Sequence, residues 1–259
     1  MLNVDGHILE ACRWGAATSP TLVLLHEGLG SVGLWRDFPQ RLHDRTGLGV
    51  FAWSRFGYGQ SNSIPLPRPL NYMHIEADQW VGRVLDAAAI ERCVLVGHSD
   101  GATIAALYAG NRQDHRVRGL VLIAPHYFVE DVAVAEIDRA RAAYEQGDLR
   151  ERLARHHRDV DSAFLGWNGT WLDPGFPAVL DLHDHLAHIR VTILQIQGVD
   201  DPYGTAAQIR FAEAATYCPI ETLMLSKARH APHLETPQPV MDGIVEFVTR
   251  IQVHDQPAR

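Results

Sequence analysis

The stretch that decides the fold is residues 93–107, which read CVLVGHSDGATIAAL. An apolar run leads into Gly97-His98-Ser99-Asp100-Gly101, and small residues follow. This order predicts a buried strand, a sharp turn and a helix. Because glycine has no Cβ, the spacing G-x-S-x-G suits a turn at which the helix start packs closely on a sheet. Such a turn lifts the Ser99 hydroxyl clear of the strand and places the Asp100 N–H at a helix N-terminus, where it can face a developing negative charge.

Two downstream segments contain the partners that a serine nucleophile requires. A serine of ordinary pKa needs a histidine base, and the base needs a third group to orient it, whereas a serine that only caps a helix needs neither. The strand-like run Val191–Ile196 leads into a loop that contains Asp201. A second such run, Glu221–Leu225, leads into a loop that contains His230. The sequence therefore predicts a catalytic triad in the order serine, acid, histidine.

This order and several further motifs resemble the α/β-hydrolase superfamily from about residue 20 to about residue 250. Besides the turn at Ser99, Leu24–Gly30 is similar to the oxyanion loop of that family. The stretch Ser54–Ser61 looks like its G-x-G-x-S loop. The resemblance implies an α/β-hydrolase fold, with a mostly parallel sheet covered by helices on both faces.

The resemblance also implies a role for individual residues. Ser99 corresponds to the nucleophile, His230 to the base and Asp201 to the orienting acid. The N–H groups of Gly28 and Asp100 correspond to the oxyanion donors. Two positions depart from the family pattern, which usually has glycine where Glu27 follows the loop histidine and where Arg229 precedes the catalytic histidine.

The loop with Asp201 and the loop with His230 each contain a second candidate for the catalytic residue. Asp201 lies three residues after Gly198, in agreement with the family spacing, whereas Asp200 is expected to bond local backbone as a turn residue. His230 comes first after its strand, and His233 is expected to cap the next helix or to lie at the surface.

An insertion interrupts the alternation of strands and helices. About 60 residues separate the strand that ends near Pro125 from the strand that begins at Val191, far more than one crossover helix requires. We expect residues 1–125 and 190–259 to form the hydrolase core and residues 126–189 to form a helical cap. Aromatic residues of a loop-like segment in this cap are expected to line an apolar pocket. The expected pocket residues are Glu27, Tyr127, Phe128, Phe164, Trp167, Trp171 and Tyr203.

Composition limits the possible partners. The net charge of −8 argues against a nucleic-acid surface, and no apolar run approaches the ~20 residues of a membrane span. The three widely spaced cysteines indicate neither a disulfide framework nor a zinc site, so a cytoplasmic enzyme is expected. The histidines at 183, 185 and 188 are interpreted as a surface cluster, with no metal and no cofactor expected. The oligomeric state does not follow from the sequence.

The predicted function is hydrolysis of a small apolar or aromatic carboxylic ester or lactone through an acyl-enzyme. One alternative is a hydrolase that cleaves carbon–carbon bonds in aromatic catabolism, in which Arg55 or Arg229 would bind a substrate carboxylate. Both arginines are more simply interpreted as solvated surface residues. Another alternative is a receptor for a small ligand that performs no hydrolysis. Serine at position 99 argues against haloalkane dehalogenases and epoxide hydrolases, which carry aspartate there.

Glu27 needs a separate prediction because its carboxylate could oppose the oxyanion charge. We expect its side chain to turn away from Ser99 and to accept hydrogen bonds from backbone N–H groups of the loop.

Overall fold

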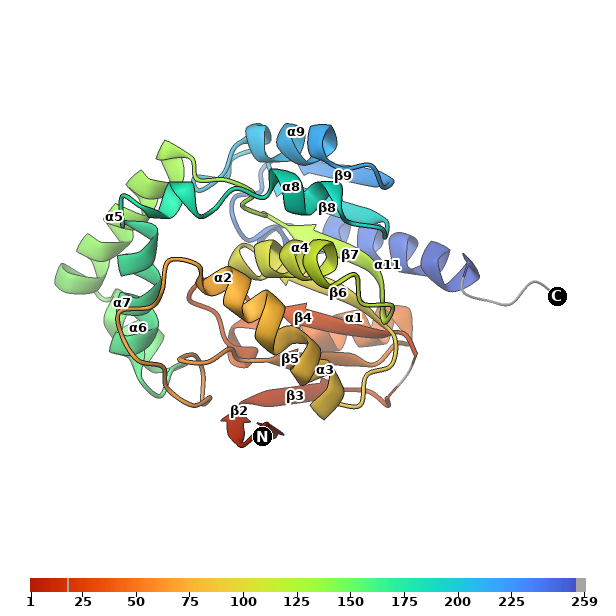
Figure 1. Ribbon diagram of the computed structural model, residues 1–259, viewed down its shortest axis with the longest axis horizontal. Helices are drawn as coiled ribbons and strands as arrows, with labels where there is room; N and C mark the ends of the chain where they lie inside the picture. Colours follow the sequence, from red (N-terminus) through yellow and green to blue (C-terminus); the bar gives the residue numbers. More distant parts are fainter. Residues whose placement is uncertain (18, 255–259) are drawn as a thin grey trace.

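A seven-stranded sheet forms the centre of the protein in the computed structural model, which describes residues 1–17 and 19–254. Residues 18 and 255–259 of the expected core lie outside the described residues. The strands are β3 (Ala11–Trp14), β4 (Thr21–Leu25), β5 (Val50–Trp53), β6 (Cys93–His98), β7 (Val117–Ile123), β8 (Ile193–Gly198) and β9 (Ile220–Leu225), preceded by a separate hairpin of β1 (Leu2–Val4) and β2 (His7–Leu9). Their order is β3-β5-β4-β6-β7-β8-β9, and only the β3–β5 pair is antiparallel within this described sheet (Figure 1).

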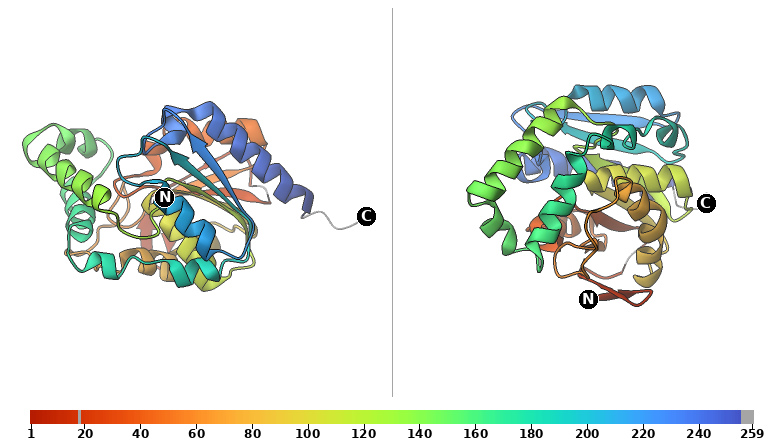
Figure 2. Two further views of the ribbon diagram at one scale, coloured as in Figure 1. Left: turned by 90° about the horizontal axis from the view of Figure 1, so that it is seen from above. Right: turned by 60° about the vertical axis from the view of Figure 1, so that its left-hand side comes forward.

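Alternate side chains of each strand enter two separate apolar clusters, one on each face of the sheet. In β4, Leu22 and Leu24 belong to one cluster, and Val23 and Leu25 belong to the other. The first face is covered by α1 (Phe38–Thr46) and α11 (Pro237–His254). The second is covered by α2 (Tyr72–Ile75), the π-helical turn η2 (Glu76–Val81), α3 (Gly82–Ala87), α4 (Asp100–Arg112), α8 (His183–Ala187) and α9 (Ala206–Ala215) (Figure 2). The predicted mostly parallel α/β architecture is confirmed.

The insertion between β7 and β8 forms further helices at one end of the sheet. They are α5 (Asp131–Gln146), α6 (Leu149–Ala154) and α7 (Val160–Trp171), which stand together on the left in Figure 1. Short helical turns complete the chain: η1 (Val32–Trp35), η3 (Phe176–Ala178) and α10 (Pro232–Glu235).

Two parts of the insertion differ from expectation. The aromatic segment expected to be loop-like is largely the helix α7, whose N-terminus is capped by the Asp159 carboxylate accepting from the Ser162 N–H at 3.0 Å. Burial of its aromatic side chains outweighs the weak helix propensity of its two glycines. Helix α8 packs on α4 of the hydrolase core, and His185 Nδ1 lies 2.6 Å from Asn111 Oδ1 there. The cap was expected to continue to residue 189 and therefore to include α8.

Candidate active site

Ser99 lies at the junction between β6 and α4. Its φ of +53° falls in the left-handed region, which is strained for a residue with a side chain. The flanking glycines make the close approach possible: a Cβ on Gly97 would lie 2.4 Å from the Gly101 carbonyl oxygen, and a Cβ on Gly101 would lie 2.0 Å from that of Leu25. The helix therefore starts directly against the sheet, as the pentapeptide predicts.

Ser99, His230 and Asp201 form a continuous hydrogen-bonded chain. The Ser99 hydroxyl lies 2.9 Å from His230 Nε2. On the other side of the ring, Nδ1 lies 2.9 and 3.0 Å from the two Asp201 carboxylate oxygens. Since a carboxylate only accepts, Nδ1 carries the proton and Nε2 is left to accept from serine. This is the arrangement in which an imidazole can act as a general base.

Asp201 is fixed by hydrogen bonds from its own loop. Its side chain is 1% exposed and accepts from the Gln197 side-chain amide at 2.8 Å and from the Tyr203 N–H at 2.8 Å. Burial acts to raise the pKa of Asp201, but the bonds from His230 and the Tyr203 backbone lower it below its usual value. Asp200 is exposed and makes no side-chain contact with His230.

His233 is not at the surface, contrary to expectation. It is 3% exposed and packs against the rings of Trp35 and Phe38. Burial lowers its pKa well below the ordinary value, which favours a neutral ring. The short helix α10 turns His233 into the apolar layer beneath the sheet, and His230 in the preceding loop is directed toward Ser99.

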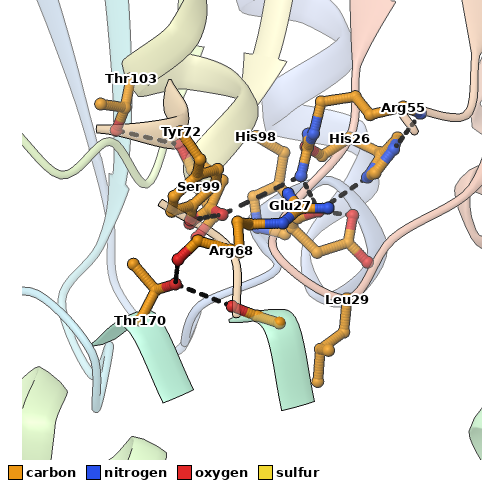
Figure 3. Close-up of polar contacts among 12 residues, drawn as sticks. His26, Glu27, Leu29, Arg55, Arg68, Tyr72, His98, Ser99, Thr103 and Thr170 are labelled. Atoms are coloured by element: carbon orange, nitrogen blue, oxygen red, sulfur yellow. Dashed lines mark hydrogen bonds and ion pairs between the residues drawn. The ribbon is translucent and has the colours of Figure 1, made fainter. Parts of the chain in front are cut away.

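Arg55 and His26 hold the loop that carries Gly28. The Arg55 guanidinium donates to the carbonyl oxygens of His26 and Glu27, and His26 accepts from the Arg55 N–H at 3.0 Å (Figure 3). His26 Nδ1 lies 2.7 Å from the Glu27 carbonyl oxygen and donates to it. Arg55 is 1% exposed, so its expected place at the surface is wrong. Its burial is possible because two carbonyl groups and the Asp100 carboxylate, 3.9 Å away, surround the charge.

Glu27 faces His98. Its carboxylate oxygen lies 3.5 Å from His98 Nδ1, and His98 Nε2 donates to the His230 carbonyl oxygen at 2.7 Å. Burial acts to raise the pKa of Glu27, but His98 and the residue's own backbone N–H lower it below the usual value. No hydrogen bond to Ser99 is present among the described contacts of Glu27. The carboxylate therefore pairs mainly with an imidazole, where loop N–H groups were expected.

A cavity of about 110 Å³ opens at the Ser99 hydroxyl. Of the expected residues, it is lined by Glu27, Gly28, Ser99, Asp100, Trp167, Trp171, Tyr203 and His230. Leu29, His126 and Ile137 complete the lining and were not foreseen. The surface that lines the cavity is mainly apolar.

Three expected pocket residues lie elsewhere. Tyr127 is fully buried, and its backbone N–H donates to the Gln208 side-chain oxygen in α9 at 2.7 Å. Phe128 packs on Phe211 of the same helix. Phe164 stacks on Tyr144, with ring centroids 3.7 Å apart, between α5 and α7. The expectation that these three side chains line the pocket is therefore wrong. Each of them packs a segment of the insertion against its neighbours.

His126 is the main residue that the sequence analysis missed. Its ring lies 5.6 Å from that of His230 and 5.1 Å from that of Trp171. Burial, followed by the nearby His230, lowers its pKa to about 3, so it is neutral at ordinary pH. The available signal was its position in the loop that follows β7, at the carboxyl end of a parallel strand.

The histidines at 183, 185 and 188 contact neighbouring side chains and backbone. His183 lies beside Asp184, and His188 Nδ1 lies 2.7 Å from the Asp184 carbonyl oxygen. Within residues 1–17 and 19–254, no group of three potential ligands is arranged for a metal ion.

Comparison with known proteins identifies the family of the fold. Residues 20–176 match the family described as the alpha/beta hydrolase fold. The chain belongs to this family. The predicted membership of the superfamily and the prediction of a hydrolase enzyme are confirmed.

Individual relatives are similar over different lengths. The pimeloyl-[acyl-carrier protein] methyl ester esterase of Aeromonas hydrophila is 26% identical over 254 residues, which cover 88% of this chain and 95% of that enzyme. Epoxide hydrolase 3 of Siraitia grosvenorii is 33% identical over 145 residues, which cover 55% of this chain and only 43% of that relative.

Solved structures show the same fold at lower identity. The enol-lactonase from Burkholderia xenovorans LB400 has a TM-score of 0.73 and 21% identity, covering 95% of this chain and 98% of its own. The meta-cleavage product hydrolase from Pseudomonas fluorescens IP01 has a TM-score of 0.72 and 16% identity, covering 96% and 97%. In the described ranges, no helix has the length and apolar content needed to cross a membrane.

Proposed function

We propose that the protein hydrolyses a small carboxylic ester or lactone through an acyl-enzyme on Ser99. The observation that carries the proposal is the chain from Ser99 Oγ through His230 to Asp201, with contacts of 2.9 to 3.0 Å, at the mouth of an apolar cavity. Ser99 attacks the carbonyl carbon while His230 Nε2 takes the hydroxyl proton. The N–H groups of Gly28 and Asp100 stabilise the oxyanion.

His230 then gives the proton to the leaving alkoxide oxygen as the carbon–oxygen bond breaks. A water molecule, deprotonated by the same imidazole, attacks the acyl-enzyme, and the acid departs as Ser99 recovers its proton. Asp201 holds the ring and stabilises the imidazolium in both steps. The strained backbone at Ser99 supports this role because such strain concentrates at functional sites.

The cap is part of the proposal. Trp167 and Trp171 of α7 and Ile137 of α5 line the cavity opposite the sheet loops. We assign α5–α7 as the cover that gives the site its apolar wall, in keeping with a small apolar or aromatic substrate. The three free thiols of Cys12, Cys93 and Cys218 support a cytoplasmic location.

Carbon–carbon bond cleavage has less support. A substrate carboxylate would need a cation, but Arg55 is occupied by loop carbonyls and Asp100, and Arg229 is exposed. Neither lines the cavity among its described residues. The relative named as an epoxide hydrolase matches only part of the chain, and serine stands at the nucleophile position here.

Kinetics of alanine variants test the proposal. Ser99→Ala and His230→Ala should each lower kcat for a short-chain nitrophenyl ester by several powers of ten, and the double variant should be little worse, because the two residues act as a unit. Ser162→Ala, which removes another buried hydroxyl, serves as the matched control and should retain activity. A folded Ser99→Ala protein that keeps most of its esterase activity would contradict the proposal and indicate a different nucleophile. A wild-type protein that cleaves no ester would favour the receptor.

A further inference from the structure

The peptide that joins Glu27 to Gly28 is held on one side and free on the other. Its carbonyl oxygen accepts from the His26 ring at 2.7 Å, from the Arg55 guanidinium at 3.0 Å and from the Gly30 N–H at 3.1 Å. Its N–H, which belongs to Gly28, has no acceptor among the residues that the structure describes. Gly28 lines the proposed catalytic cavity, so the wall of this cavity contains an unpaired donor.

The geometry of the peptide bond connects its two sides. This peptide is trans, so its C=O and N–H bonds lie in one plane and point in opposite directions. Arg55 and His26 lie outside the described lining of the cavity, and the carbonyl oxygen that they hold therefore points away from it. The Gly28 N–H then points toward the cavity. Donation to the carbonyl oxygen also polarises the peptide and strengthens its N–H as a donor, most of all when the donating group is charged.

Arg55 supplies the charged donor and binds the loop as a fork. One terminal nitrogen donates to the Glu27 carbonyl oxygen, and the other donates to the His26 carbonyl oxygen of the preceding peptide (Figure 3). The same guanidinium lies 3.9 Å from the carboxylate of Asp100, whose N–H is the second proposed oxyanion donor. Arg55 therefore contacts both segments that carry the proposed donors, and at 1% exposure it is shielded from water.

We propose that Arg55 is a positioning residue for the hydrolysis. Together with His26, it fixes the Glu27–Gly28 peptide. The Gly28 N–H then faces the oxyanion that forms when Ser99 attacks the substrate carbonyl carbon. The planar fork matters because two successive carbonyl oxygens accept from two nitrogens of one group, which the single ammonium of lysine does not reproduce. This inference rests on the proposed function and specifies what orients one of its donors.

Replacement of Arg55 by lysine separates this role from that of a buried charge. Arg55→Lys keeps a cation beside Asp100 and loses the fork that spans the two loop carbonyls. Arg68→Lys is the matched control, because Arg68 is also a buried arginine, with 5% exposure. Arg68 donates to the Phe56 carbonyl oxygen, and none of its described hydrogen bonds involves residues 26–28.

Two matched ketones isolate the oxyanion. With trifluoromethyl propyl ketone, the Ser99 oxygen bonds to the carbonyl carbon, the hydroxyl proton passes to His230 and the carbonyl oxygen becomes an anion. Methyl propyl ketone has the same propyl chain and a less electrophilic carbonyl group, so it binds mainly as the uncharged ketone. The ratio of its Ki to that of the trifluoromethyl ketone therefore measures stabilisation of the oxyanion. A change in the shape of the cavity alone affects both inhibitors.

This ratio should fall about 10-fold or more in Arg55→Lys and stay within about two-fold of the wild-type value in Arg68→Lys, because removal of a whole oxyanion donor costs about 100-fold or more. The kcat for nitrophenyl butanoate should fall by a similar factor in Arg55→Lys with little change in KM, since the contact with the oxyanion forms only in the transition state. An unchanged ratio in folded Arg55→Lys, or an equal fall in Arg68→Lys, overturns the inference.

If Arg55→Lys does not fold, His26→Gln decides. Glutamine removes the ring donor to the Glu27 carbonyl oxygen, and its amide oxygen replaces the acceptor for the Arg55 N–H. The ratio should then fall about three-fold or more, and an unchanged ratio overturns the inference. Failure of the proposed function is distinct, because then wild type binds both ketones alike or Ser99→Ala binds the trifluoromethyl ketone as tightly as wild type.

Discussion

Two carboxylates, Glu27 and Asp100, lie along the cavity in which a negative charge is proposed to form on the substrate. Each has a basic group beside it: His98 lies 3.5 Å from Glu27, and Arg55 lies 3.9 Å from Asp100. A lone carboxylate in a site of low dielectric would oppose the oxyanion, and the Arg55 guanidinium beside Asp100 reduces this conflict. His98 also connects Glu27 to the backbone of His230. We therefore interpret Glu27 as a residue that positions the histidine loop.

Replacement of Glu27 by glutamine tests this interpretation. The amide keeps the shape and loses the charge that faces His98, so Tm should fall by a few degrees, which corresponds to about 1 kcal/mol. The kcat/KM should fall by a similar factor for every ester, because the position of His230 affects all substrates. Glu246→Gln, at an exposed site, is the control. A normal Tm with loss confined to deacylation or to one substrate class would instead assign Glu27 to water or substrate.

At the scale of elements, the contact between β4 and the start of α4 sets the position of Ser99. A Cβ on Gly101 would lie 2.0 Å from the Leu25 carbonyl oxygen, and backbone on both sides leaves no room to adjust. Gly101→Ala should therefore destabilise the protein by about 3 kcal/mol or more and displace the serine. Gly169→Ala is the matched change: it lies on α7 with open space around it, and should stabilise by about 0.5–1 kcal/mol. Urea unfolding of both variants measures the difference, and equal midpoints would refute the close-packing account.

The strands and the triad could be predicted from sequence because their signals are local. Continuous apolar runs mark the strands, and each proposed catalytic residue follows one of them. The positions of Arg55 and of the aromatic residues of the insertion were harder to predict. The burial of a side chain depends on contacts with groups that are distant in the sequence. Nothing in the order of residues shows that two loop carbonyls surround Arg55, or that Phe164 stacks on Tyr144 and does not enter the cavity.

At the scale of the whole molecule, buried neutral imidazoles connect stability to pH. Burial lowers the pKa of His26 and His233 well below 6.5 and that of His126 to about 3. The unfolded chain binds protons at these residues below pH ~6.5, whereas the folded chain does not, so stability falls as the pH drops through this range. Each residue contributes up to about 1.4 kcal/mol per pH unit.

Urea unfolding between pH 7.5 and 5 should show this decline in the free energy of unfolding. His233→Leu should reduce the slope by about one proton, and His115→Gln, whose parent side chain is 94% exposed, should leave it unchanged. A free energy of unfolding that is flat over this range would show that the buried rings take up protons in the folded state.

The central claim, that Ser99 is the nucleophile, is tested most directly by covalent labelling. The protein is treated with a fluorophosphonate, digested, and analysed by mass spectrometry to locate the adduct. The account predicts one adduct, on the peptide that contains Ser99, formed far more slowly in His230→Ala and in step with loss of esterase activity. An adduct on another residue, or full inactivation with Ser99 unmodified, would contradict it.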